Sequence, residues 1–600
     1  MRSAVTFLGA VRRVMGARVI VEVSPDIPSA NPIINGRVHR LGQIGSFVRI
    51  PLGFQNVYGI VSMVGAMPDN VPQELLQHLE STGQRWIEVQ LVGEAYGREG
   101  FQRGVSVFPT IDDEVHIVTE DDLRVVYADA GPSMVEIGQH SASDSLKALV
   151  DLDKIVTRHV AIVGSTGSGK SNTVACILKA LGSGTFPNAH VVVIDPHGEY
   201  GAALADRARV YAIGDATHPL VVPYWALSFD ELAWFLVDRR ATSETLQDTA
   251  LRDKVCEEKR KGCDKLTAGK IDGADITVDS PVPFSLRGLW YYFDRKERVT
   301  YNDMARTNEA LVKEGDATNL TPAQFAPPAA GSAAPFKPTS SLNMGSYLTK
   351  IVNRLKDRRF DFLLSPRDYD GVQKDLHDLL AAWLDHEHAI TVLDLGGVPS
   401  EVTDLIVGVL TRILFEGMFW GRDLPGIGKQ RPLLIVYEEA HGYLPRGGNA
   451  QFVAGYASRA VRRVFKEGRK YGVGAIVVSQ RPSELDETVL SQCGTFVTLR
   501  LANGDDQGRV KAVVPDALAG LIDLLPALRT GEALILGEAI RIPSRVRLPL
   551  IEPRPRSDDP EVAARWAEAR TSGARYDSAV TGWRRQRMAT VPVLPAKKEA

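Results

Sequence analysis

Cysteine is scarce in this sequence. Only four cysteines, Cys176, Cys256, Cys263 and Cys493, occur among 600 residues, and no two of them form a CxxC pair. A disulfide framework and a zinc ribbon both need closely spaced cysteines, so the sequence supports neither. The few isolated thiols fit a reducing compartment, and we expect a cytoplasmic protein.

Long apolar runs and an excess of one charge are also missing. No apolar run approaches the roughly 18 residues of a membrane-spanning helix, and arginines interrupt the apolar start of the chain, where a signal peptide would lie. We therefore expect a soluble protein that does not enter a membrane. The formal net charge of −3 gives no overall basic signature, but basic residues confined to a pore would not show in that total. Net charge leaves the partner undecided.

The composition that remains is that of a globular protein, with 44% hydrophobic and 24% charged residues. A chain of this length needs several domains. Short β-rich runs separated by glycines come first and predict a small barrel. Strands that alternate with helices follow and predict a mostly parallel sheet. A charged stretch with helical patterning interrupts this alternation. The predicted fold class is α/β, with these parts: an N-terminal β-barrel at 1–135, a RecA-like core at 136–225 and 386–550, a helical insertion at 226–385, and a C-terminal extension at 551–600.

A phosphate-binding loop is the most specific motif. The segment GSTGSGKS at 164–171 matches the pattern GxxxxGKS in full and lies between an apolar strand and a predicted helix. Glycines let backbone amides turn toward phosphates, Lys170 neutralises the β and γ oxygens, and the Ser171 hydroxyl can ligate Mg²⁺. We therefore expect ATP and Mg²⁺ as cofactors. The residues assigned to the nucleotide are Gly164, Ser165, Thr166, Gly167, Ser168, Gly169, Lys170, Ser171, Asn172 and Asp195.

Two further apolar strands end in polar residues. PLLIVYEEAH at 432–441 ends in two carboxylates, which are costly to bury unless a cation or a water uses them. It is typical of a Walker B element, in which Glu438 contacts the metal shell and Glu439 polarises the attacking water. The alternative is an acidic strand end beside a helix N-terminus. Gln480, at the end of AIVVSQ, is the candidate sensor of the γ-phosphate, although a glutamine there is often only a turn residue.

The segment VVVIDPHGEYG at 191–201 brings more polar residues to a strand end, on a strand that we expect beside the P-loop strand. Asp195 or Glu199 fits a water or magnesium network there. His197 is not expected to bind a metal, because no second histidine lies at ligand spacing.

Arginines also cluster before the sensor strand. Arg462, Arg463 and Arg469 lie in VRRVFKEGRKYGVG at 461–474. They either form a solvated helix face or reach across a subunit boundary toward a neighbour's phosphate.

Together, RHVAIVGSTGSGKSN, VVVIDPHGEYG, VYEEAHGYLP and KEGRKYGVGAIVVSQRPSEL resemble the HerA family of the FtsK–HerA superfamily. The resemblance covers nearly the whole chain and implies a homohexameric ring that hydrolyses ATP and threads double-stranded DNA, with a barrel at its N-terminus and a bracing extension at its C-terminus. It also implies that Arg158 acts across the subunit interface, and that Arg463 or Arg469, if not Arg462, is a second such residue. Without the resemblance, Arg158 would be expected to pair with Asp151 or Asp153.

The same resemblance implies a partner, either a NurA-like nuclease in DNA end processing and repair, or a sirtuin-like NADase or nuclease effector in antiviral defence. Two alternatives stay open: a ring scaffold that assembles and regulates such an effector, and a conjugation or secretion ATPase, which commonly carries the membrane spans that this sequence lacks. For DNA, the loop GYLPRGGNA with Arg446 is the candidate contact. The C-terminal extension either packs on a neighbour or is a solvated helix.

Overall fold

A computed structural model describes most of the chain, in two compact units. The first comprises Met1–Val210, Glu387–Leu393 and Phe415–Ser557, and the second Tyr211–His386, Asp394–Leu414 and Asp558–Ala600. The residues described are 6–25, 27, 33–34, 37–38, 44–65, 85–96, 100–127, 131–141, 146–239, 244–266, 269, 271–330, 333–448, 455–514, 518–556, 562–568 and 576–586.

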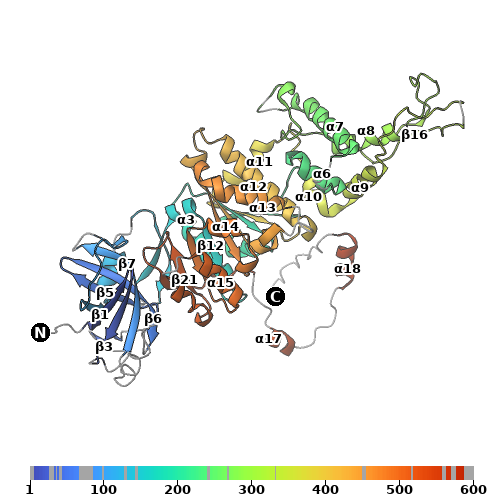
Figure 1. Ribbon diagram of the computed structural model, residues 1–600. Coiled ribbons are helices and arrows are strands. Elements are labelled where there is room, and N and C mark those ends of the chain that lie inside the picture. Colours follow the sequence, from blue (N-terminus) through green and yellow to red (C-terminus); the bar gives the residue numbers. More distant parts are fainter. Residues whose placement is uncertain are drawn as a thin grey trace, which may run out of the picture. The chain divides into compact units, whose positions relative to one another are not determined.

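The first unit begins with a closed β-barrel, drawn in blue in Figure 1. Its strand order is β2-β1-β9-β5-β6-β7, and pairing of β2 with β7 closes the ring. Alternate residues of each strand point inward, so valines such as Val19, Val21 and Val89 fill the interior. The strands are β1 (Phe7–Met15), β2 (Arg18–Val23), β5 (Phe47–Leu52), β6 (Gln55–Gly65), β7 (Arg85–Tyr96) and β9 (Glu114–Ile117), with β8 (Gln102–Arg103) on β7.

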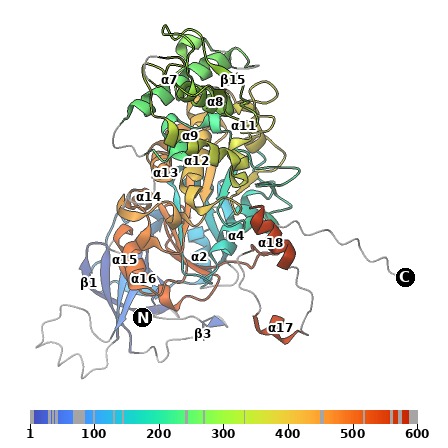
Figure 2. The same ribbon diagram turned by 90° about the vertical axis from the view of Figure 1, so that its right-hand side faces the viewer.

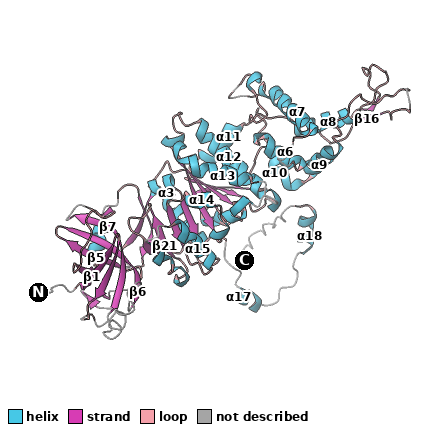
Figure 3. Ribbon diagram, viewed as in Figure 1, coloured by secondary structure: helices cyan, strands magenta, loops and turns pink. Residues whose placement is uncertain are grey.

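A sheet of eleven strands organises the rest of this unit, and Figure 3 shows it in magenta. Its central strands β20, β12, β19, β18 and β13 run parallel, and β21, β22, β10 and β11 continue one side antiparallel. The order is β11 (Lys147–Asp151), β10 (Met134–His140), β22 (Ser544–Arg547), β21 (Glu532–Gly537), β20 (Thr495–Thr498), β12 (Val160–Val163), β19 (Val473–Ser479), β18 (Leu433–Tyr437), β13 (Val191–Asp195), β17 (Ile390–Asp394) and β14 (Ala208–Ala212). A barrel followed by a RecA-like core confirms the predicted fold class.

The strand order corrects one expectation. β13, which carries Asp195, was expected beside the P-loop strand β12, but β19 and β18 lie between them. After β12 the chain skips two strand positions and forms β13, and only later do β18 and β19 occupy the positions between them. Strands that are consecutive in the sequence are therefore not always neighbours in the sheet. β12 is instead flanked by β19 and β20.

Helix α4 (Lys170–Leu181), labelled in Figure 2, covers one face of the sheet. Its apolar residues pack in one cluster with alternate residues of the parallel strands, including Val160 and Ile162 of β12. The other helices of the core are α3 (Leu152–Arg158), α13 (Tyr456–Glu467), α14 (Glu487–Ser491) and α15 (Gly504–Val513), and α12 (Thr403–Trp420) passes from the second unit into the first.

The second unit is mainly helical. Capping boxes start three of its helices, at Ser228, Thr245 and Asp375, where side chains satisfy the first free amides. Its helices are α6 (Phe229–Val237), α7 (Leu246–Cys263), α8 (Leu286–Arg298), α9 (Gly345–Lys356), α10 (Asp361–Leu364) and α11 (Leu376–Leu384), and β15 (Leu311–Lys313) pairs with β16 (Gln324–Phe325).

The C-terminal extension contains two short helices, α17 (Val562–Ala567) and α18 (Tyr576–Arg584). Their tryptophans are exposed: Trp566 by 86% and Trp583 by 75%. No helix within the described ranges is both long enough and apolar enough to cross a membrane.

Candidate nucleotide site

The loop between β12 and α4 has a shape that only glycine permits at two positions. Gly169 has a φ of +103°, which side chains rarely adopt. A Cβ atom on Gly164 would lie 2.6 Å from Ser168 Oγ and 2.8 Å from the Cβ of Leu499. The glycines of the motif are therefore required by the loop itself.

Backbone contacts brace this loop from neighbouring strands. The backbone amide and the hydroxyl of Ser165 both donate to the carbonyl of Arg500 at 2.9 Å, and the amide of Gly531 donates to the Ser168 carbonyl at 3.1 Å. The Ser168 hydroxyl is buried and has no hydrogen-bond partner among the residues described. The cradle is thus held open by protein contacts on its outer side.

Lys170 brings a positive charge to the inner side of the loop. It is 6% exposed, and its Nζ lies 3.5 Å from the Ser165 carbonyl. Burial lowers the pKa of Lys170, while the nearby Glu439 and Glu438 act in the opposite direction. The lysine therefore lies near the two carboxylates predicted as the Walker B pair.

Glu438 is fully buried at the end of β18. Burial holds the pKa of Glu438 well above its usual range, and the charges of Glu439 and Glu199 add to this effect. Burial and the neighbouring carboxylates therefore favour the protonated form of Glu438. A cation at this carboxyl group would reverse that preference.

Glu439 has strained backbone geometry. Its φ of +47° and ψ of +44° place a residue other than glycine in the left-handed region, which is costly and is concentrated at functional sites. The side chain is nearly buried.

Gln480 joins Glu439 to the P-loop. Because β19 lies between β12 and β18, the residue after β19 reaches both neighbours. Its amide nitrogen donates to Glu439 Oε1, and its amide oxygen accepts from the Thr166 hydroxyl. The structure therefore brings the three predicted motifs together through direct side-chain contacts.

His441 also belongs to this cluster and was not singled out from the sequence. Its Nδ1 lies 3.2 Å from Glu439 Oε2 and 3.4 Å from the Ser479 hydroxyl. Burial lowers the pKa of His441, which favours the neutral ring, and Glu439 opposes this. The only sequence signal was its position two residues after Glu439 in EEAH.

Two residues assigned to the nucleotide have other partners. The Asn172 side chain donates to the carbonyl of Pro549 and accepts from the amide of Ile551, both at 2.9 Å, which ties α4 to the segment after β22. The Asp195 carboxylate accepts from the amides of His197, Gly198 and Tyr200, so it shapes the turn after β13. Their contact with nucleotide stays a prediction.

The four candidate arginines differ in their partners. Arg158 pairs with Glu538 at 3.2 Å, and not with the aspartates considered from the sequence. Arg462 pairs with the buried Asp486, and Arg463 pairs with Glu416 and stacks on Phe415. Arg469 is exposed, and among the residues described it has no ion pair.

The predicted DNA contact Arg446 is exposed and lies 3.1 Å from Glu487. Arg509 approaches the same carboxylate at 3.3 Å. Residues 449–454, which complete the predicted loop, lie outside the described residues.

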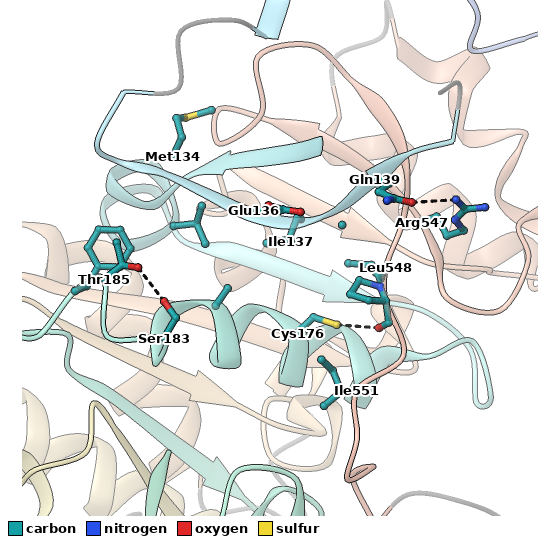
Figure 4. Close-up of a pocket in the computed structure, with 15 residues that line it drawn as sticks. Met134, Glu136, Ile137, Gln139, Cys176, Ser183, Thr185, Arg547, Leu548 and Ile551 are labelled. Atoms are coloured by element: carbon teal, nitrogen blue, oxygen red, sulfur yellow. Dashed lines mark hydrogen bonds between the residues drawn. The ribbon is translucent and has the colours of Figure 1, made fainter. Parts of the chain in front are cut away.

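A cavity of about 550 Å³ lies elsewhere on α4, between that helix and β10, as Figure 4 shows. Apolar residues such as Ile137, Leu548 and Ile551 line it together with Arg547. Cys176, on the same wall, donates to the Pro549 carbonyl at 3.2 Å. None of its lining residues belongs to the loop Gly164–Ser171, so it is separate from the nucleotide site.

Comparison with known proteins agrees with this geometry. Residues 135–414 match the family model described as helicase HerA, central domain. This part of the chain is therefore similar to the HerA central domain. The P-loop lies within this range, the carboxylates Glu438 and Glu439 follow it in the sequence, and the chain is an ATPase.

Relatives of the HerA domain were found in archaea. The chain is 26% identical over 455 residues to a probable helicase of Methanocaldococcus jannaschii, covering 74% of this chain and 75% of that protein. It is 25% identical over 507 residues to the DNA double-strand break repair helicase HerA of Pyrococcus furiosus, covering 82% and 83%. Among solved structures, plasmid coupling protein TrwB bound to a GTP analogue is 13% identical, with a TM-score of 0.42, covering 73% of this chain and 94% of TrwB.

Proposed function

We propose that this chain is an ATP-driven translocase or helicase acting on double-stranded DNA. The observation that carries the proposal is the contact of Gln480 with both Thr166 and Glu439, which unites loop, sensor and carboxylate in one site. The relatives named as helicases support DNA as the substrate.

Stimulation of ATP hydrolysis by DNA tests this function. The purified chain should hydrolyse ATP faster when linear duplex DNA is added, and Lys170→Ala should remove both the basal and the stimulated rate while leaving the thermal midpoint near that of the wild type. Equal rates with and without DNA, together with no displacement of a duplex-bound protein, would reject the motor and favour the ring scaffold.

The residues at the site fit Mg²⁺ with ATP. Ser171 offers a hydroxyl and Glu438 a buried carboxyl group whose oxygens lack good hydrogen-bond partners among the described residues. Magnesium usually takes few protein ligands and several oxygens from phosphate and water, so no larger carboxylate cluster is needed. The ion would neutralise charge on the phosphates, while Lys170 binds them and Glu439 accepts the proton of the attacking water.

Assembly into a homohexamer is part of the proposal. Each site would be completed by arginines of the next subunit, which is a heterologous contact that closes into a ring. Arg158 is proposed as one of them. For the second we propose Arg469, because Arg462 and Arg463 are engaged within their own chain, whereas Arg469 is exposed. A native mass near six times 65.5 kDa would support the ring.

A partner nuclease or sirtuin-like effector completes the proposal, with support from the family resemblance. Repair and antiviral roles differ in the effector and not in the motor. The effector's activity on DNA or NAD, assayed with wild type and with Lys170→Ala, would separate a motor that drives it from a scaffold that only holds it.

A further inference from the structure

In the hydrogen bond between Thr166 and Gln480, the threonine hydroxyl is the donor. An ionised Glu439 carboxylate can only accept hydrogen bonds, so Gln480 must present its NH₂ group to it. The amide oxygen of Gln480 then faces Thr166, and the threonine hydroxyl must be the donor. With the hydroxyl donating, both the oxygen and the nitrogen of the Gln480 amide are engaged in this orientation.

This arrangement divides the two oxygens of Glu439. Oε1 is occupied by Gln480, whereas Oε2 is buried, has no hydrogen-bond partner of good geometry among the described residues, and lies 3.2 Å from His441 Nδ1. The left-handed backbone conformation of Glu439 sets the direction in which its side chain leaves the main chain. The hydrogen bond from Gln480 sets the orientation of the carboxylate group. Oε2 is therefore the oxygen that Gln480 does not occupy.

We propose that Thr166 is a positioning residue for ATP hydrolysis: its hydroxyl fixes the Gln480 amide, which in turn orients Glu439. The inference rests on the proposed role of Glu439 as the group that accepts the water proton. It also changes the role of Thr166, which the motif alone assigns to the nucleotide. An amide nitrogen carries two hydrogens, so Gln480 oriented in this way can serve Glu439 and a phosphate oxygen together.

A pair of matched variants tests the proposal. Thr166→Val keeps the shape of the side chain but lacks the donor, and Thr166→Ser keeps the donor. We expect the valine variant to lower kcat about tenfold, the rate equivalent of losing one hydrogen bond, with KM and nucleotide Kd unchanged. The serine variant should recover to within about twofold of the wild type. Thr349→Val, which changes an exposed threonine on α9, is the control for the substitution itself.

The results separate this role from the alternatives. A weaker nucleotide Kd in Thr166→Val with unchanged kcat would show that the hydroxyl binds nucleotide, and equal losses in the valine and serine variants would show a role in packing only. Either result overturns the proposal, as does an unchanged kcat in Thr166→Val.

A double-mutant cycle with Gln480→Leu tests whether Thr166 acts through Gln480. Because leucine cannot accept the hydrogen bond, Thr166→Val should have no further effect in that background, and independent losses would overturn the proposal. All rates are measured without DNA, so a failure of the translocase proposal leaves this test intact. A fully active Glu439→Gln would refute the role of Glu439 separately.

Discussion

Two adjacent glutamates at the end of β18 lie in different surroundings. Glu438 is buried, and its raised pKa favours the neutral form. Glu439 is held by Gln480 and has a strained backbone. The first therefore suits a metal shell and the second suits the water.

Glu439→Gln tests this division of roles. The amide keeps the size of the side chain but cannot accept a proton, so we expect ATP binding to persist while kcat falls at least about 100-fold, as for loss of a general base. Binding of a fluorescent ATP analogue and steady-state hydrolysis are the two measurements. Loss of nucleotide affinity would instead assign Glu439 a structural role.

At this scale, the sequence was informative about residue types but not about their contacts. Lys170, Glu438, Glu439 and Gln480 follow from motifs, because phosphate and water chemistry demand those side chains. The Thr166 contact with Gln480 depends on β19 lying between β12 and β18, which no local pattern reveals. His441 was missed for the same reason.

Among the elements, α4 links the P-loop to the end of the core. Asn172 makes two hydrogen bonds to the segment after β22, and Lys179 donates to the Glu552 carbonyl at 2.8 Å. These contacts hold the first residues of the C-terminal extension and the residues just before it. They would transmit any displacement of α4 to that segment.

We expect Asn172→Ala to act on stability and not on the nucleotide. Loss of two hydrogen bonds should cost about 1–2 kcal/mol and lower the thermal midpoint by a few degrees, with nucleotide Kd within about twofold of the wild type. Differential scanning calorimetry and nucleotide titration measure the two quantities. Weakened binding with an unchanged midpoint would restore Asn172 to the nucleotide site.

His159 connects three elements at the start of β12. Its Nδ1 accepts from the Ala475 amide in β19 and its Nε2 donates to the Phe465 carbonyl in α13, each at 3.1 Å. Both ring nitrogens are used by the neutral form. Burial accordingly lowers the pKa of His159 to about 4, although the bond to Phe465 opposes this.

This histidine makes stability depend on pH. The pKa of His159 in the folded state lies below the value of about 6.5 in the unfolded chain. The contribution of His159 to the free energy of unfolding is therefore complete above pH 6.5, falls as the pH drops, and levels off below pH 4. The full loss is about 3 kcal/mol. His159→Asn, which can still accept from Ala475, should flatten the fall in thermal midpoint between pH 7 and pH 5. An identical pH slope in both proteins would contradict this.

For the molecule as a whole, local patterns predicted the strands better than their arrangement. The apolar runs of β12, β13, β18 and β19 were recognised because parallel strands covered on both faces are continuously apolar. Their order was not, and β13 was misplaced, because the order depends on crossovers that span hundreds of residues. β10 and β11 were also missed, since polar residues interrupt the apolar pattern of their short runs.

DNA binding should be independent of sequence and sensitive to salt. A motor that holds the phosphate backbone releases counterions, so affinity should fall by about 10³-fold or more between 50 and 200 mM salt if six or more phosphates are contacted. Arg446→Ala should reduce the slope of log K against log salt by about one if this arginine contacts a phosphate. Fluorescence anisotropy with two unrelated duplexes measures both. Salt-insensitive binding, or preference for one duplex, would argue against a translocase.

We expect Arg158 to act in catalysis across the subunit boundary. Arg158 ends α3 just before the P-loop strand, and its side chain is 37% exposed beside Glu538 at the surface of the core. An exposed ion pair of this kind contributes little to stability, so the arginine could exchange Glu538 for a phosphate of the next protomer at little cost.

In that position, its guanidinium would stabilise charge that develops on the transferred phosphoryl group. Arg158→Ala and Lys170→Ala rings should each be inactive, but mixed rings contain some interfaces in which an intact Arg158 faces an intact Lys170. Hydrolysis should therefore reappear after subunit exchange, rising with the fraction of such interfaces. Glu538→Gln is the matched control, because it removes the resting partner of Arg158 and should leave hydrolysis intact. An active Arg158→Ala ring, or verified mixed rings without recovery, would show that Arg158 serves only its own chain.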